Sequence, residues 1–304
     1  MSNLLSLRAY PSGRKTGIMS EAMDIRILDD SDQPKLEAFL IGHRDSSMFL
    51  RSNALRVGLV YRDAPFSALY TGAIDGERVI GVVAHAWSGM VLLQCPGNLD
   101  ELARRCIQSS GRKVTGFAGP ADQVRRAQIA LNLVGAPAKM AEDEWLYALD
   151  LAELKIPELL TNGNIHCRPP LSEERDLLCE WRSAYDIETL GSSDSEETRN
   201  RAAAALDRQI AEGNAWISIR NGVPVSLSAF NATLPDIVQL GGIYTPPEHR
   251  GRGYAKTAVA ASLIAARQRG ASRAVLFTSN PSAARSYEAV GFRRLGDYGL
   301  ILLK

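Results

Sequence analysis

The order in which strand and helix patterns follow one another constrains this fold most strongly, because the same order occurs twice. In each half of the 304-residue chain the patterns run strand, two helices, hairpin, strand, helix, strand, helix, strand. The hairpins are marked by the turn pair Asp75-Gly76 in the first half and Asn221-Gly222 in the second. The chain therefore reads as two tandem α/β modules, one a diverged copy of the other.

Hydrophobic periodicity and turn signals place the elements along the chain. In the first half they predict a strand at 24–28, helices at 34–40 and 46–55, a hairpin of 67–74 and 79–87, a strand at 90–94, a helix at 98–109, and then strand 114–118, helix 121–133 and strand 145–151. In the second half they predict strand 165–168, helices 172–185 and 195–212, hairpin 215–220 and 223–233, strand 237–245, helix 253–268, strand 274–278, helix 281–290 and strand 300–303. The turn-rich segment 156–164 separates the halves. We expect a flexible extension at 1–23, a first domain at 24–155 and a second at 164–304.

Composition and charge exclude several classes of protein. The net charge of +1 lacks the basic excess of a nucleic-acid-binding surface. No apolar run approaches the roughly 20 residues that span a bilayer, and the first residues contain no signal-peptide core. The four cysteines form no CxxC pair and have no histidine at metal-ligand spacing. We expect a soluble cytoplasmic protein, a monomer or homodimer, with no metal and no nucleic-acid or membrane partner.

The segment most informative about chemistry joins the strand at 237–245 to the helix at 253–268. It reads Arg250-Gly251-Arg252-Gly253-Tyr254-Ala255. A helix N-terminus offers unpaired N–H groups and partial positive charge, to which phosphate binds readily. Glycines let the backbone approach an anion closely, and arginines add charge-assisted hydrogen bonds. The dinucleotide and Walker A patterns are absent. These residues indicate either a pyrophosphate-binding loop or a glycine-rich surface turn with arginines.

Two motifs in this half resemble those of the GNAT superfamily of acyl-CoA-dependent N-acyltransferases. The loop fits the superfamily's Q/R-x-x-G-x-G/A motif at Arg250, Gly253 and Ala255. The stretch 280–292 fits the second signature, N-x-x-A-x-x-x-Y-x-x-x-G-F, with Asn280 first and Tyr287 in the tyrosine position. The resemblance covers about the last third to half of the chain. It implies an α/β (α+β) fold of two GNAT-like modules, each a mixed, mostly antiparallel sheet flanked by helices.

The resemblance also implies roles for residues that bind acetyl-CoA, the expected co-substrate. Backbone N–H groups of the loop would hold the pyrophosphate; these belong to Arg250, Gly251, Arg252, Gly253, Tyr254 and Ala255. The segment of Ile243, Tyr244 and Thr245 would pair with the pantetheine amides as an added strand does. Gly241 and Gly242 would mark a bulge that separates this strand from the next. Asn280 would lie near the CoA arm.

Tyr287 is expected to be the catalytic residue. Attack of an amine on a thioester expels a thiolate, and a phenol near pKa 10 passes a proton readily to a thiol near 8.5. The alternative is that Tyr287 only packs on its helix. The general base stays open, because the strand at 237–245 lacks the glutamate that many relatives carry there. Asp186, Glu188, Glu248 and a water relay are the candidates.

The first half carries no counterpart of either motif. Its matching loop reads Gln94-Cys95-Pro96-Gly97-Asn98-Leu99, and Arg126 falls where the second half has Tyr287. We expect this half to bind CoA weakly or not at all.

The sequence therefore predicts an N-acetyltransferase that moves an acetyl group by direct transfer from acetyl-CoA to a primary amine of a small-molecule or peptide acceptor. The alternative is a non-catalytic acyl-CoA-binding sensor or scaffold, which the missing strand carboxylate and the degenerate first half motivate.

Overall fold

The structure, a computed structural model, describes residues 24–304, so the extension predicted at 1–23 lies outside the described residues. The strands of the first half are β1 (Asp24–Ile27), β2 (Ala68–Asp75), β3 (Arg78–Ala86), β4 (Met90–Gln94), β5 (Gly116–Pro120) and β6 (Ala138–Asp150). Its helices are α1 (Gln33–Ile41), α2 (Met48–Val57), α3 (Leu99–Ser110) and α4 (Ala121–Ala130).

The second half repeats this order after a short helix in the connection. Its strands are β7 (His166–Arg168), β8 (Ala215–Arg220), β9 (Val223–Thr233), β10 (Ile237–Leu240), β11 (Arg273–Thr278) and β12 (Arg293–Leu303). Its helices are α5 (Glu158–Thr161), α6 (Arg175–Leu190), α7 (Glu196–Ala211), α8 (Tyr254–Gln268) and α9 (Pro281–Ala289).

All twelve strands form one sheet in the order β1-β2-β3-β4-β5-β12-β6-β11-β10-β9-β8-β7. Among the described strands the parallel pairs are β4–β5 and β10–β11, and the other neighbours are antiparallel. The mostly antiparallel sheet flanked by helices is confirmed, and the repeated order of elements is that expected of two tandem modules.

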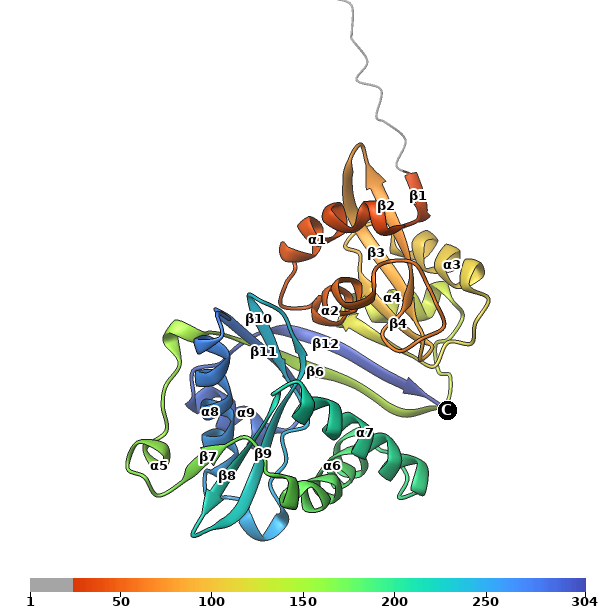
Figure 1. The fold of residues 1–304 in the computed structure, drawn as a ribbon. Helices are drawn as coiled ribbons and strands as arrows, with labels where there is room; N and C mark the ends of the chain where they lie inside the picture. Colours follow the sequence, from red (N-terminus) through yellow and green to blue (C-terminus); the bar gives the residue numbers. More distant parts are fainter. Residues whose placement is uncertain (1–23) are drawn as a thin grey trace, which may run out of the picture.

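The last strand of each half crosses to the other half. β12 pairs with β5 over Tyr298–Leu302, and β6 pairs with β11 over Trp145–Asp150. Figure 1 shows β6 and β12 side by side as two long strands between the upper and lower parts of the molecule. Both are longer than the predicted segments 145–151 and 300–303, because their outer ends are stabilised by pairing that short-range patterns cannot report.

β6 contributes side chains to two hydrophobic cores. Leu146 and Ala148 pack in the core that contains residues of α1 and α2. Tyr147 and Leu149 alternate with them and pack in the core beneath α8 and α9. The crossing strands are thus buried on both faces, and each half relies on a strand from the other. Separate folding of 24–155 and 164–304 stays a prediction.

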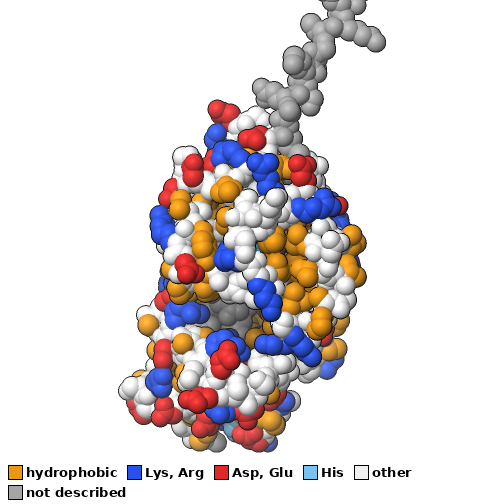
Figure 2. Space-filling view, turned by 90° about the vertical axis from the view of Figure 1, so that its right-hand side faces the viewer, with side chains coloured by type: hydrophobic (Ala, Val, Ile, Leu, Met, Phe, Trp, Pro, Cys, Tyr) orange, Lys and Arg blue, Asp and Glu red, His pale blue; other side chains and the backbone are white. Residues whose placement is uncertain are grey.

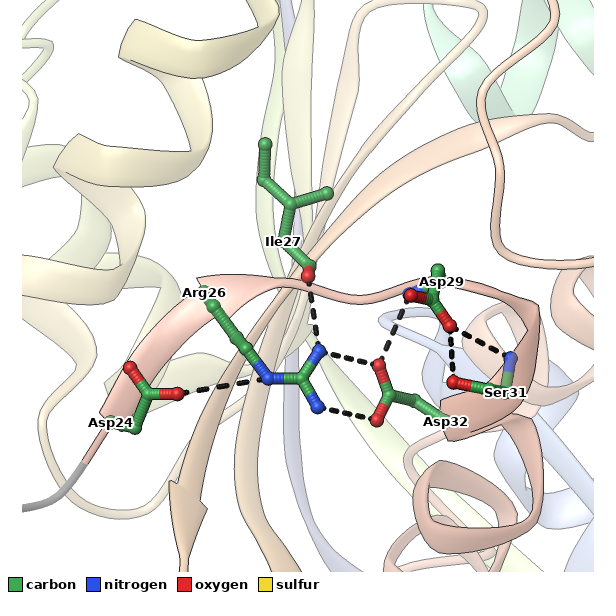
Figure 3. A network of polar contacts seen from close by, with 6 residues as sticks. All are labelled: Asp24, Arg26, Ile27, Asp29, Ser31 and Asp32. Atoms are coloured by element: carbon green, nitrogen blue, oxygen red, sulfur yellow. Dashed lines mark hydrogen bonds and ion pairs between the residues drawn. The ribbon is translucent and has the colours of Figure 1, made fainter.

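A polar network attaches β1 to the first helix (Figure 3). The two terminal nitrogens of Arg26 each donate to a carboxylate oxygen of Asp32 at 2.6 Å. This bidentate pair holds the pKa of the buried Asp32 carboxyl below its usual value. Asp29 accepts a hydrogen bond from the Ser31 N–H at 2.8 Å and caps the turn at 30–32. The turn from strand to helix is therefore held by charge-assisted bonds.

None of the helices within 24–304 combines the length and the apolar character that crossing a membrane requires.

We predict that Leu300→Pro destabilises both halves together. Leu300 faces Ala118 of β5 and Glu142 of β6, so proline in this central strand removes a ladder hydrogen bond. A lost buried bond costs about 1–3 kcal/mol. Urea unfolding would be followed in two variants that keep a single tryptophan, Trp87 in the first half or Trp216 in the second. Both midpoints should fall; a shift of one alone would contradict the mutual dependence.

Candidate functional site

The sheet opens between β10 and β11, beside the predicted loop. The parallel pairing of these strands ends at Gln239 opposite Val275, although β11 continues to Thr278. β10 ends at Leu240 instead of the predicted 245, because the register on β9 is irregular between Gln239 and Leu240. Gly242 follows with φ of 71°, a conformation that favours glycine. The predicted bulge is therefore present at the point where the two strands separate.

The loop after this opening leads to an uncapped helix. Gly253 is the N-cap of α8 with φ of 79°, no side chain caps the helix, and its first turn has no acidic residue. Gly251 has φ of 74°, and a Cβ atom there would meet nothing within 4 Å. The N–H groups of Tyr254 and Ala255, in the first turn of α8, therefore have no capping side chain, and the space beside Gly251 is open. This geometry fits an anion such as a pyrophosphate.

The side chain of Arg250 is engaged within the protein. Its Nε donates to the Thr245 carbonyl at 2.9 Å, and its Nη2 donates to Glu188 at 2.6 Å. The other oxygen of Glu188 accepts from the Tyr244 hydroxyl at 2.8 Å. Arg250 therefore holds the loop against the preceding segment, and the anion-binding groups of the loop are its backbone N–H groups.

Two further loop residues, Arg252 and Tyr254, lie together at the start of α8. The Tyr254 hydroxyl accepts a hydrogen bond from Arg220, and this contact with the cation, reinforced by Arg252, lowers the pKa of the phenol. Tyr254 is otherwise buried against Ile165 and Val225. Its ring therefore attaches the helix start to the sheet.

The segment predicted to pair with pantetheine is only partly available. Both backbone groups of Tyr244 bond to Leu227, at 3.0 and 2.8 Å. The Thr245 carbonyl is occupied by Arg250. Ile243 has no backbone partner within residues 24–304. Asn280 caps α9, since its side-chain oxygen accepts from the N–H groups of residues 282 and 283 at 2.8 and 3.3 Å.

Tyr287 lies on α9 and is 7% exposed. Its ring makes an edge contact with Phe292, with 6.1 Å between centroids. Burial raises the pKa of its hydroxyl, and negative charge on Tyr185 of α6 or on Glu144 of β6 would raise it further. Helices α6 and α9 and strand β6 therefore bring Tyr185, Tyr287 and Glu144 close enough to affect one another's pKa. Tyr287 remains protonated at neutral pH.

Glu144 is the residue of this group that the sequence did not indicate. It lies opposite Tyr298, one position beyond Trp145, which pairs with the last residue of β11. It is 7% exposed, and its carboxyl group has no hydrogen-bond partner among residues 24–304. Burial, with a smaller contribution from Glu142, raises its pKa to about 7. Glu144 stands in an acidic run, and only the crossing of β6 into the second half brings it near Tyr287.

Two of the predicted general bases are occupied and one is exposed. Asp186 is buried, with one oxygen 3.1 Å from Arg182 Nε and the other 3.9 Å from Arg201. Glu188 is paired as described above. Glu248 lies exposed in the turn before Arg250. Among these carboxyl groups, Glu144 is therefore the one that is buried, has no partner and lies close enough to Tyr287 to affect its pKa.

The bulge at Gly242 is covered by α6. The Nη1 atom of Arg182 lies 2.7 Å from the position that a Cβ on Gly242 would occupy, and it is buried without a hydrogen-bond partner. The Gly242 N–H approaches the Tyr185 hydroxyl and opposes the rise in its pKa that burial causes. The dihedral angle favours glycine here, and a larger residue would also displace the end of the Arg182 side chain.

In the first half, the start of α3 corresponds to the start of α8, and charged side chains of the protein surround it. Arg126 of α4 donates to the Gly97 carbonyl at 3.0 Å and to Asp100 at 3.4 Å. Asp100 and Glu101 occupy the first turn of α3. Two carboxylates there already complement the helix dipole and repel a phosphate.

Within residues 24–304, no group of three or more His, Cys, Asp or Glu could hold a metal ion.

Ionisation of Glu144 is expected to make stability depend on pH. Its folded pKa near 7 exceeds the usual 4.5, so the folded state binds more protons between these values. Stability therefore falls as pH rises from about 4.5 to 7. Glu144→Gln should remove this loss and stabilise the protein at pH 8 by about 3 kcal/mol. Urea unfolding at pH 5 and 8 measures it. Glu142→Gln removes only the smaller contribution to the pKa of Glu144 and should keep most of the pH dependence. Equal pH dependence in Glu144→Gln and wild type would contradict the assignment.

Comparisons with known proteins agree with this geometry. The sequence profile of the acetyltransferase (GNAT) family matches residues 177–292, and no curated protein sequence matches the chain.

A Drosophila protein of known structure has a TM-score of 0.63 at 13% identity, over 92% of this chain and 98% of its own. A GCN5-related N-acetyltransferase from Kribbella flavida has a TM-score of 0.55 at 18% identity, over 86% and 95%. A tandem GNAT protein from the clavulanic acid biosynthesis pathway has a TM-score of 0.53 at 14% identity, over 92% of this chain and 97% of its own. Residues 177–292 are therefore a domain of the GNAT acetyltransferase family, in a chain with the fold of tandem GNAT proteins.

Proposed function

We propose that the second half transfers an acetyl group from acetyl-CoA to a primary amine of a small-molecule or peptide acceptor, with Tyr287 as proton donor and Glu144 as general base. The observation that carries this proposal is the electrostatic contact of Tyr287 and Glu144 with each other and with Tyr185, whose hydroxyl the Gly242 N–H approaches where the sheet opens. Family membership supports acyl transfer; the acetyl group and the amine are our proposal.

The residues present fit the groups that acetyl-CoA carries. Backbone N–H groups at 251–255 suit the pyrophosphate, and the free backbone groups of Ile243 suit a pantetheine amide. The amine nitrogen attacks the thioester carbonyl carbon, and the carbon–sulfur bond breaks. Glu144 accepts the proton that the nitrogen loses, for which a pKa of about 7 is well matched. Tyr287 donates its proton to the departing sulfur.

A pair of substitutions at Gly251 tests the binding loop. Asparagine and aspartate both tolerate the positive φ, and a Cβ there has open space, so the two variants differ mainly in charge. Gly251→Asp should weaken acetyl-CoA binding at least about tenfold more than Gly251→Asn, because a carboxylate repels the pyrophosphate. Isothermal titration calorimetry measures both. Equal affinities would place the pyrophosphate elsewhere.

Two further substitutions test the chemistry. Release of the CoA thiol would be followed with a panel of primary amines, and the best acceptor used for kinetics. Tyr287→Phe should lower kcat about 100-fold or more with little change in acetyl-CoA affinity, since the proton is needed only in the transition state. We expect kcat/KM of wild type to rise as pH passes about 7, and Glu144→Gln should lower kcat and abolish this rise. Binding without turnover for every amine would favour the sensor instead.

A further inference from the structure

A cavity lies between the two halves, apart from the site described above. It encloses about 870 Å³, within the range of about 300–1,000 Å³ typical of small-molecule sites. None of Tyr287, Tyr185 and Glu144 lines it. Its walls come from equivalent elements of the two halves: α2 and the turn after β3 on one side, α7 and the turn after β9 on the other.

The lining is mainly apolar. Leu92, Ala118 and Leu300 contribute from three neighbouring strands, and Trp87 and Phe66 contribute aromatic rings. Those two rings lie 5.2 Å apart between centroids, and Trp87 is 38% exposed. Phe66 has φ of 71°, an uncommon conformation for a bulky residue. An apolar molecule of moderate size fits such walls. Hydrophobic side chains also gather on the face of the protein drawn in Figure 2, interspersed with Lys and Arg.

Two guanidinium groups face the ring of Phe66 on the cavity wall. Arg56 lies 4.4 Å and Arg208 5.3 Å from its centroid. Glu212 pairs with Arg56 and also accepts from Asn214 at 3.1 Å. The guanidinium group of Arg208 has neither an ion pair nor a hydrogen bond within residues 24–304. The wall therefore carries two guanidinium groups and one carboxylate, and that carboxylate is paired directly with Arg56 and only at longer range with Arg208.

The environment of Arg208 disfavours its charge. Although Arg208 is exposed, partial desolvation lowers its pKa; Glu212 opposes this shift, and the neighbouring cations Arg56 and Arg182 add to it. A bound anion would offset this cost and supply the hydrogen-bond acceptors that the guanidinium lacks.

We propose that this cavity binds an amphipathic carboxylate, with an alkyl or aromatic body against the apolar walls and its carboxylate on Arg208. Because the walls belong to both halves, such a ligand bridges them and stabilises the folded protein. The site is independent of the acetyl-transfer reaction proposed above.

Decanoate is a suitable probe, and decanol shares its chain without the charge. Titration below the micellar range would be followed by Trp87 fluorescence, with Trp87→Phe to assign the signal. Decanoate should bind at least about tenfold more tightly than decanol and raise the melting temperature with concentration. Arg208→Gln should remove the preference for decanoate, and Arg208→Lys should retain most of it.

Arg199→Gln is the matched control, since Arg199 lies on the same helix, pairs with Asp194 and does not line the cavity. This variant should bind decanoate as wild type does. Absence of decanoate binding to wild type would overturn the proposal. So would an unchanged preference for decanoate in Arg208→Gln, which would mean that the carboxylate lies elsewhere.

Discussion

The pairing of β6 with β12 is the interaction on which the rest of the structure depends. These strands pair along nearly their whole lengths, and each continues the sheet of the half to which it does not belong in sequence. Without β12 the first half would expose the edge of β5, and without β6 the second half would expose the edge of β11. The exchange covers both edges at once and joins two GNAT-like modules into one sheet.

The same exchange determines the chemistry available to the second half. The GNAT-family segment contributes the loop, the helix start and Tyr287, but no unpaired buried carboxyl. Glu144 reaches that site only because β6 crosses over and extends past the end of β11. A carboxyl left without a partner in a buried place costs stability, and such costs gather at functional sites. The first half, although it carries no intact motif, therefore contributes a residue to the proposed reaction.

Much of this could be predicted from the sequence, and the failures have one cause. Local patterns predicted the order of elements, the glycine-rich loop and its helix, because turn residues and helix starts act over a few positions. They underestimated β6 and β12, overextended β10 and did not indicate Glu144. Each of these depends on pairing between residues more than 100 positions apart, or on its interruption at Gly242, which no short-range pattern reports.

The starts of α3 and α8 show how two copies of one fold can diverge in function through few residues. Both helices follow a strand and a glycine-containing loop. At α8 the first turn carries no acid, and Arg250 is turned back to Glu188, so the N–H groups remain available. At α3 the acids in the first turn already neutralise the helix dipole, and Arg126 closes the loop by bonding to Gly97. The fold is thus kept in both halves because packing and strand exchange require it, whereas the proposed anion binding depends on a few charges at the helix start that differ between the halves.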